Sequence, residues 1–347
     1  MQRAISTDLR WEVRRIEDFD AVAPLWDRLN ERHANTPLLD ADFFRILLKH
    51  HGAAASAAAA VAYQLDQPIA AGLFQRLTLG SWQTVQPSQA PLGAWVDARL
   101  EDTETLLRKL LLALPGYPLV VAVTQQDPSL SMRPVDGGLL RTIDYIESAA
   151  VPVDSSFGDY WEKRGKNLIK NIRRQRNKLQ REGVAVSARW VSDPGAIGRA
   201  VDEYGLLESA GWKGAEGTAL HPDNLQGRLY RDLMEHYAAR GEAFVYQYFY
   251  GSELVASELC LHRHKTMYML KTTYSEAQQG TSPAMLMRQE MLMEVFNRKI
   301  FSVIEFYGRL MDWQPKWTDH SKTLYHINVY RSRILAAIKA RTARHGK

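Results

Sequence analysis

Residues 267–306 read MYMLKTTYSEAQQGTSPAMLMRQEMLMEVFNRKIFSVIEF, and this stretch decides the fold. The pattern predicts a strand over 267–274, a polar loop, a helix from Pro283 and a second strand over 300–306. Ser282 is a suitable helix N-cap, and Pro283 suits the first helical position, which needs no N–H donor. Gly280 permits close approach of the backbone to a ligand, and the helix N-terminus attracts anions. The stretch therefore predicts a loop that cradles a phosphate; an ordinary Ser-Pro helix start that binds nothing is the alternative.

The segments before this stretch repeat a similar order of helices and strands. The sequence EAFVYQYFYGSELVASELCLHRHKTMYMLKTTY predicts three strands that turn at Gly251-Ser252 and near His264-Lys265. The pieces AYQLDQPIAAG and YQYFYGSELVAS are alike, each a strand, a polar turn and a second strand. We therefore expect an α/β (α+β) fold of two tandem modules, each a mixed central sheet flanked by helices. The expected domains are 1–150, 151–325 and a basic C-terminal helix or tail over 326–347.

Composition limits the class of protein. The chain has 347 residues and a net charge of +5, and 46% of its residues are hydrophobic, which is typical of a globular protein. No run of 18 apolar residues occurs, and the first residues lack the apolar core of a signal peptide, which predicts a cytoplasmic protein. The single cysteine, Cys260, excludes an internal disulfide and a cysteine metal cluster. We expect no metal site.

Positive charge is concentrated in the second half of the chain. Residues 1–150 carry 14 basic and 18 acidic side chains, whereas residues 151–347 carry 30 and 21. The stretch 163–183, KRGKNLIKNIRRQRNKLQREG, has nine Lys or Arg residues and one acid. On a helix, Trp161, Leu168, Ile172 and Leu179 fall near one apolar stripe and the cations fill the other faces. Arg173 and Arg174 are expected to hold an anion; nucleic acid, an anionic membrane surface and plain solvation remain alternatives.

Several segments together resemble a known family. They are RRQRNKLQREG, LESAGWKGAEGTAL, MLKTTYSEAQQGTSPAMLM and EFYGRLMDWQPKWT, in this order. They resemble CelD-like acyltransferases of exopolysaccharide and cellulose operons, which belong to the GNAT superfamily and are related to the FemAB aminoacyl transferases. The resemblance covers residues 155–320, and residues 10–150 match only in layout, as a degenerate first module.

The resemblance implies an acyl-CoA donor, acetyl-CoA or another, bound by a loop of the type Arg/Gln-x-x-Gly-x-Gly/Ala. Gly280 matches the first glycine, but Ala277 stands where the pattern has Arg or Gln, and Ser282 takes the second glycine's position. Fem-type transfer from aminoacyl-tRNA therefore remains an alternative. The residues expected to bind the donor are Leu270, Lys271, Thr272, Gln279, Gly280, Thr281, Ser282 and Ala284.

Four side chains are candidates for acid–base catalysis. Glu208 and Glu305 are candidate bases, His262 is a third, and Tyr307 is a candidate general acid. His262 and His264 alternate on a predicted strand, and Glu258 stands four residues before His262, which predicts a Glu–His pair. Helix ends, half-buried strand faces and core packing are the competing interpretations. The residues expected to contact the acceptor, besides Arg173 and Arg174, are Trp212, Lys213, Asp312, Trp313 and Lys316.

These features predict an acyl-CoA-dependent N- or O-acyltransferase that acts on a sugar-containing acceptor by direct transfer in a ternary complex. The partners expected are a small-molecule or glycan acceptor and an anionic membrane surface, with tRNA ranked behind them. A non-catalytic protein that binds nucleic acid or assembles polysaccharide is the alternative from another class. The sequence gives no indication of oligomeric state.

Overall fold

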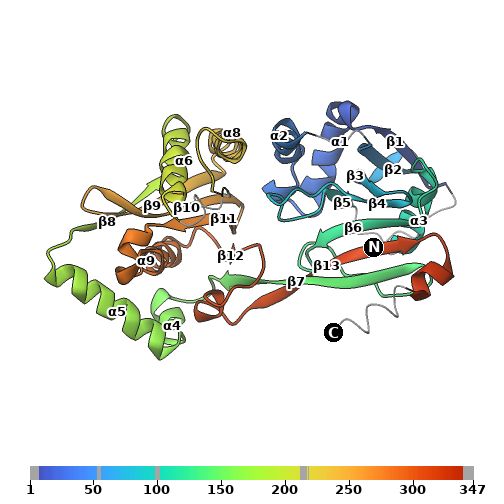
Figure 1. Ribbon diagram of the computed structural model, residues 1–347. Helices are drawn as coiled ribbons and strands as arrows, with labels where there is room; N and C mark the ends of the chain where they lie inside the picture. Colours follow the sequence, from blue (N-terminus) through green and yellow to red (C-terminus); the bar gives the residue numbers. More distant parts are fainter. Residues whose placement is uncertain (1–7, 53–55, 98–101, 212–216, 218, 339–347) are drawn as a thin grey trace. The chain divides into compact units, whose positions relative to one another are not determined.

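The computed structural model in Figure 1 describes residues 8–52, 56–97, 102–211, 217 and 219–338. The chain divides into two compact units. The first consists of Met1–Glu147 with Lys322–Lys347, and the second of Ser148–Ser321. Strand β7, Leu140–Pro152, runs from the first unit into the second.

The first unit is built around a mixed sheet. Its strands are β1 Arg10–Arg15, β2 Ala58–Gln64, β3 Gln67–Thr78, β4 Ser81–Thr84, β5 Trp95–Asp97, β6 Val120–Gln126 and β13 Ser321–Tyr330. Its helices are η1 Ile16–Asp18, α1 Phe19–Arg32, η2 Pro37–Leu39, α2 Ala41–His51 and α3 Thr103–Ala113. Neighbouring strands pair antiparallel except β4 and β6, which are parallel and are joined through α3. The leucines of α3 pack against alternate alanines of β2 in one buried cluster.

The last strand corrects the expected domain boundaries. Residues 326–330, predicted to begin a basic tail, belong to β13, which pairs antiparallel with β6. Lys322 Nζ lies 2.7 Å from Oδ2 of the buried Asp127, and the backbone N–H of Gln125 donates to His326 Nδ1 at 2.9 Å. These contacts hold a strand of alternating polar and apolar residues in the sheet, and no local sequence feature predicts them.

The second unit is also a mixed sheet with helices. Its strands are β8 Val186–Val191, β9 Ala243–Tyr250, β10 Glu253–Arg263, β11 Thr266–Tyr274 and β12 Val303–Glu305, with the end of β7 at the sheet's edge. Its helices are α4 Phe157–Glu162, α5 Lys166–Arg181, α6 Pro194–Ser209, α8 Leu225–Ala239, η3 Glu276–Thr281, α9 Pro283–Arg298 and η4 Gln314–Lys316. The predicted three-strand segment is confirmed as β9, β10 and β11.

Helices cover both faces of this sheet. Helices α6 and α8 lie on one face, and α9 lies on the other with α4 and α5 beyond it (Figure 1). Strands β11 and β12 are parallel and joined through α9, as β4 and β6 are joined through α3 in the first unit. Each unit is therefore a mixed sheet flanked by helices, and the predicted fold class is confirmed.

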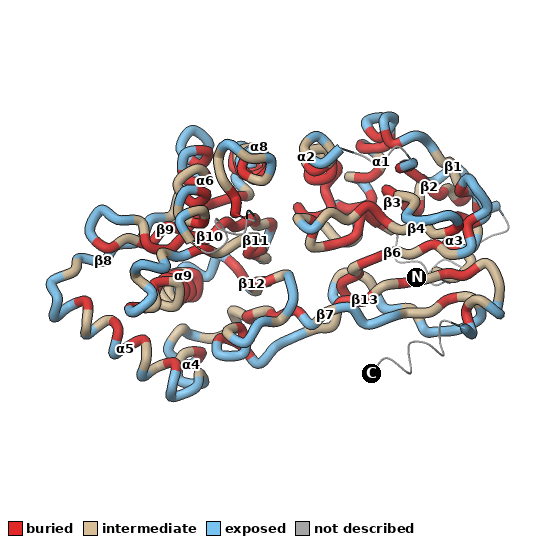
Figure 2. The backbone as a smooth tube through the Cα atoms, viewed as in Figure 1, coloured by how far each residue is buried: buried red, intermediate tan, exposed pale blue. Residues whose placement is uncertain are grey.

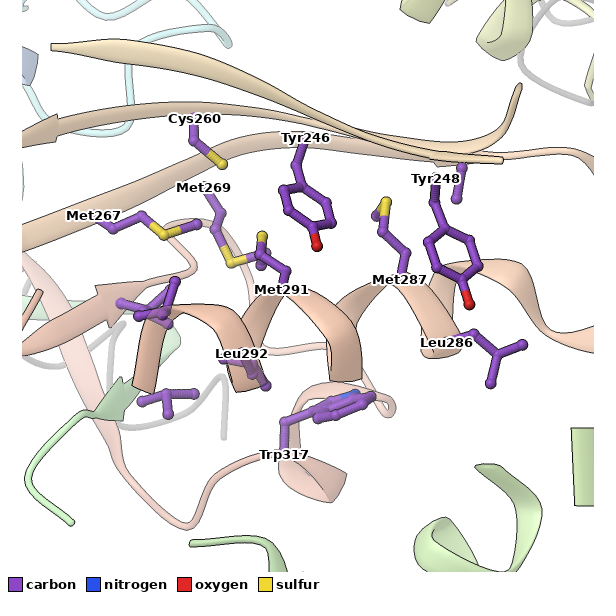
Figure 3. Close-up of a cluster of buried hydrophobic side chains, with 14 of the residues drawn as sticks. Tyr246, Tyr248, Cys260, Met267, Met269, Leu286, Met287, Met291, Leu292 and Trp317 are labelled. Atoms are coloured by element: carbon purple, nitrogen blue, oxygen red, sulfur yellow. The ribbon is translucent and has the colours of Figure 1, made fainter. Parts of the chain in front are cut away.

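The core under α9 follows from its sequence period. Leu286, Met291 and Val295 recur at helical spacing and are fully buried. Figure 3 shows Met287 and Met291 of α9 on the side of the helix that faces Tyr246 and Tyr248 of β9, Cys260 of β10, and Met267 and Met269 of β11. Met287 and Met291 are therefore core residues, and they hold the helix, and with it the loop at its N-terminus, against the sheet. Within the part of the chain that the structure describes, none of the helices combines the length and apolar composition needed to cross a bilayer.

Candidate active site

The parallel strands β11 and β12 part shortly after they meet. Their register has three partners and ends at Tyr268↔Glu305, while β11 continues to Tyr274. Beyond this point β11 is paired on one edge only, with β10. The register with β10 shifts between Lys271 and Met269, so Leu270 is an extra residue in a bulge. A one-sided strand with a bulge leaves backbone N–H and C=O groups for a ligand.

The loop after β11 is a short 3₁₀ helix, η3, that leads into α9. Tyr250 donates from its hydroxyl to Thr281 Oγ1 at 3.0 Å, and Thr281 Oγ1 donates to the carbonyl of Gln278 at 2.7 Å. Gln279 and Gly280 are exposed, and no atom lies within 4 Å of the place where a Cβ of Gly280 would stand. The loop is thus anchored at Thr281 and open at Gly280.

The predicted cap at Ser282 is wrong in its detail. Ser282 precedes the first helical residue, Pro283, but its side chain makes no capping hydrogen bond. Its backbone is left-handed, with φ 54° and ψ 56°, whereas a side chain caps from an extended backbone. The N–H of Ala284 has no carbonyl four residues before it within the helix. The helix start therefore keeps an N–H group directed out of its end.

Glu208 lies at the C-terminal end of α6 and is almost completely buried. Its Oε2 accepts from the backbone N–H of Leu220 at 2.7 Å and lies 3.7 Å from Lys271 Nζ, and its Oε1 accepts from the Tyr204 hydroxyl at 3.2 Å. Lys271 also lies 5.4 Å from the centre of the Tyr230 ring. Burial first, and then the nearby Glu208, raises the pKa of Tyr204, so its hydroxyl stays a hydrogen-bond donor. The cluster joins the sheet to α6 and α8.

Glu305 shares this face of the sheet. Residues that are register partners lie on the same face of a sheet, so Glu305, Tyr268 and Leu261 face the same way. Lys271 is the partner of Leu259, which is two residues from Leu261, so Lys271 lies on this face as well. Because Lys271 contacts α6 and α8, this is the face that those helices cover. Glu305 is buried, with 7% of its surface exposed. Strand β12 ends at Glu305, and Tyr307 beyond it stacks on Tyr268, which faces the same way as Glu305, with ring centres 5.9 Å apart.

The opposite face contains a buried ion pair that sequence reasoning missed. Arg288 of α9 donates from Nη2 to Glu258 Oε1 at 2.9 Å and to Thr272 Oγ1 at 3.1 Å. Thr272 donates to the same carboxylate oxygen at 2.5 Å. The Glu258 side chain is fully buried and that of Arg288 is 5% exposed. The sequence does contain a sign of this pair, because Glu258 and Arg288 each stand within an apolar stretch, VASELCL and MLMRQEMLM.

Trp313, in the segment that follows β12, packs against the arginine of this pair. The Arg288 guanidinium lies 4.0 Å from the centre of the Trp313 ring, and Phe306 packs edge-on against the same ring at 5.4 Å. Asp312 and Lys316, expected to contact the acceptor with Trp313, are exposed on either side of it. Trp313 is therefore a packing partner of the buried arginine.

The two predicted histidine arrangements are wrong. His264 lies in the turn after β10 with φ 52°, so it does not share a strand face with His262. Glu258 pairs with Arg288, and the His262 ring packs against Phe244 and Phe301 at 6.0 and 5.3 Å. His262 lies two residues from Cys260 and four from Glu258, on the α9 face, so the sheet separates it from Glu208, Lys271 and Glu305.

The basic stretch forms α5 as predicted, with Leu168, Ile172 and Leu179 buried. Trp161 belongs to the preceding helix, α4. Arg173 and Arg174 are exposed on the outer face of α5, and Arg174 donates to Asn171 at 2.8 Å. Arg176 is not on that outer face: it donates to Gln289 and Glu290 of α9 at 2.9 and 2.7 Å.

Two expected acceptor residues, Trp212 and Lys213, lie outside the described residues. Among the residues that are described, no group of three or more His, Cys, Asp and Glu side chains is arranged to hold a metal ion. Cys260 is buried, and burial raises the pKa of its thiol well above the usual value, so it is a poor nucleophile.

We expect Arg288→Met to lower the free energy of unfolding by about 3–5 kcal/mol, because it leaves the Glu258 carboxylate buried without its cation. The double variant Glu258→Leu/Arg288→Met removes both charges and should recover most of that loss. Urea unfolding of the wild type, both single variants and the double variant measures the coupling. If the loss in free energy of unfolding of the double variant equals the sum of the losses of the two single variants, the two residues are not coupled.

A second expectation concerns His262, whose pKa is lowered by burial, an effect that Glu242 partly opposes. The folded protein therefore favours the neutral ring. The stabilisation that comes from the neutral ring should be fully present above the ordinary histidine pKa of 6.5. The free energy of unfolding should fall as the pH drops from 6.5 through the lower pKa that His262 has in the folded protein.

His262→Phe removes this proton-linked loss, so its free energy of unfolding should rise relative to wild type as the pH falls below 6.5. The matched control is His264→Asn in the exposed turn, which should track the wild type. Urea unfolding at a series of pH values gives the comparison; parallel curves for His262→Phe and wild type would refute a lowered pKa.

Residues 166–314 match a family model described as Acetyltransferase (GNAT) domain. The match begins at the first residue of α5 and ends in η4, so it contains β8 to β12 and α9. No curated protein sequence matches the chain.

Solved structures share the fold of both units at low identity. FemX has a TM-score of 0.56 and 11% identity, covering 94% of this chain and 99% of FemX. The C-terminal domain (DUF2156) of a protein from Agrobacterium fabrum has a TM-score of 0.55 and 13% identity, and the match covers 93% of this chain and 96% of that domain. L-PGS from Bacillus licheniformis has a TM-score of 0.50 and 16% identity, and the match covers 87% of this chain and 95% of that structure. These likenesses concern the fold. The chain thus carries in residues 166–314 an acetyltransferase domain of the GNAT type, and this domain makes it an acyltransferase.

Proposed function

We propose that the protein transfers an acyl group from acyl-CoA to an amine or hydroxyl of a sugar-containing acceptor, an exopolysaccharide or cell-envelope precursor, in the cytoplasm. The second unit is the catalytic one, and the first is a degenerate copy of the same module. The sequence segments that resemble CelD-like enzymes support this choice of acceptor.

One observation carries the proposal: β11 and β12 part after Tyr268 and Glu305 and leave one edge of β11 without a strand partner. An extended ligand that carries amide groups can hydrogen-bond along such an edge. The open loop at Gly280 and the start of α9 then lie at the end of the same strand, where N–H groups suit phosphates. Leu270, Lys271 and Thr272 would line the acyl arm, and Gln279, Gly280, Thr281, Ser282 and Ala284 would surround the phosphates.

The chemistry needs a base for the attacking group and a donor for the thioester oxygen. The Leu270 bulge frees a backbone N–H that can stabilise the oxyanion formed when the acceptor attacks the carbonyl. We assign the base to Glu305, since it is buried and lies where the two strands part. Tyr307, beside it in sequence, returns a proton to the leaving thiolate.

Glu208 and His262 fit other roles better. Both carboxylate oxygens of Glu208 accept hydrogen bonds, and Lys271 neutralises it, so its role is to orient Lys271. His262 lies on the far face of the sheet from Glu305. Asp312 and Lys316 remain candidates for contact with the acceptor.

Fem-type transfer from aminoacyl-tRNA is the second candidate. Ala277 replaces the Arg or Gln of the acyl-CoA loop pattern, and the fold is shared with FemX. Such an enzyme would bind a charged tRNA end along β11 in place of the acyl arm, and a lack of affinity for acyl-CoA would favour it.

The donor assignment predicts that acetyl-CoA and longer acyl-CoAs raise the melting temperature, because they bind the folded state. ATP serves as the control for general phosphate attraction. Gly280→Trp should weaken acyl-CoA binding at least tenfold by filling the open space at η3. Titration calorimetry measures the dissociation constants.

Gly137→Trp is the matched control, since a side chain at Gly137 in the first unit also meets no atom within 4 Å. It should keep wild-type affinity. Equal affinity of Gly280→Trp and wild type would overturn the loop assignment, and absence of any acyl-CoA binding would overturn the donor.

The base assignment predicts that Glu305→Gln lowers kcat by about 10²–10⁴, typical of a lost general base, with little change in donor affinity. The assay follows CoA release with amino sugars and their nucleotide-linked forms as acceptors. Glu253→Gln, an exposed carboxylate at the start of β10, should behave as wild type. A kcat for Glu305→Gln within threefold of wild type would remove Glu305 from the mechanism.

A further inference from the structure

The outer face of α5 is a continuous cationic strip. Figure 2 shows buried and exposed positions alternating along α5. The buried residues, Leu168, Ile172, Gln175 and Leu179, fall on one side of the helix at about 100° per residue. Lys166, Lys170, Arg173, Arg174 and Arg181 lie on the opposite side, within an arc of about 100° at 100° per residue. The strip is about 22 Å long at 1.5 Å per residue. We call these five residues the α5 strip.

The α5 strip is not neutralised by the protein itself. Within the described residues none of its five cations pairs with a carboxylate. The two other cations of α5 do have acidic neighbours: Arg176 pairs with Glu290, and Lys178 lies 4.0 Å from Glu182. Asn177 and Gln180, which share the surface with the strip, are uncharged hydrogen-bonding side chains. The strip is therefore available to an external anion.

The shape and composition of the strip favour a planar anion. A straight helix with its cations in one arc can place all five against a flat surface together, whereas the phosphate row of a nucleic-acid duplex winds away from a straight helix. No aromatic side chain stands on α5, so bases have nothing to stack on. No large apolar residue stands in the strip, so contact with lipid would be electrostatic and without insertion.

We infer that the α5 strip docks the protein on an anionic lipid surface through phosphate headgroups. This extends the proposed function by indicating where a lipid-linked acceptor would be met. It does not depend on the identity of the acyl donor. The strip belongs to the same unit as the β11–β12 site, and α5 packs on α9 through Arg176 and Asn171.

The test uses the full chain and sedimentation with vesicles of phosphatidylglycerol and phosphatidylcholine at about 50 mM salt. Each basic residue near an anionic surface contributes about 1 kcal/mol, which is about fivefold in partitioning. The triple variant Lys170→Gln/Arg173→Gln/Arg174→Gln should therefore partition about a hundredfold more weakly. Binding of the wild type should fall as salt is raised.

The control triple variant is Lys265→Gln/Lys299→Gln/Arg309→Gln, which removes the same charge from exposed sites elsewhere in the second unit. It should bind vesicles nearly as the wild type does. Equal losses in the two triple variants would mean that net charge alone drives binding, and no binding to phosphatidylglycerol would also overturn the inference. So would tighter binding to duplex RNA at equal phosphate concentration, if the α5 triple variant abolishes it. Acyl-CoA titration of the α5 triple variant separates failure of this surface from failure of the donor site.

Discussion

The buried ion pair between Glu258 and Arg288 joins the three parts on which the candidate site depends. It ties β10 to α9, and through Thr272 it also holds β11 beyond the point where β12 leaves. A buried pair of this kind costs desolvation free energy that only good geometry repays, and losing one partner is expensive. The arrangement therefore favours the observed position of α9 against the sheet. Because η3 leads directly into α9, the open loop at Gly280 is fixed by the same contacts.

The sheet of the second unit divides the polar side chains into two sets. Glu208, Lys271 and Glu305 share the face covered by α6 and α8, and Glu258, Thr272 and His262 share the face covered by α9. Acid–base chemistry requires groups that can reach the same atoms, so the division matters more than distance along the chain. It favours Glu305 and Tyr307 for proton transfer and leaves His262 as a packed ring on the other side.

The two units share one arrangement of strands and a helix but differ in how far the paired strands extend. Each has a parallel pair joined through a helix, β4 and β6 around α3, and β11 and β12 around α9. In the first unit β4, the counterpart of β11, ends at Thr84, one residue after its last partner in β6. In the second unit β11 keeps an edge without a strand partner after Tyr268. That difference supports the assignment of catalysis to the second unit.

The sequence by itself determined the fold class, the three strands from 243 to 274, the strand–loop–helix around Gly280 and the amphipathic α5. These features rest on local signals: hydrophobic period, turn residues and charge composition act over a few residues and can be read in order. Only the tertiary structure decided the pairing of Glu258 with Arg288 rather than His262, the bonds that occupy Glu208, and the separation of His262 from Glu305. It also decided that residues 326–330 form a strand. Each of these depends on which face of the sheet a residue occupies and on partners that are up to 201 positions away. Such contacts follow from register and from the way helices pack on the sheet, and a local pattern does not specify either.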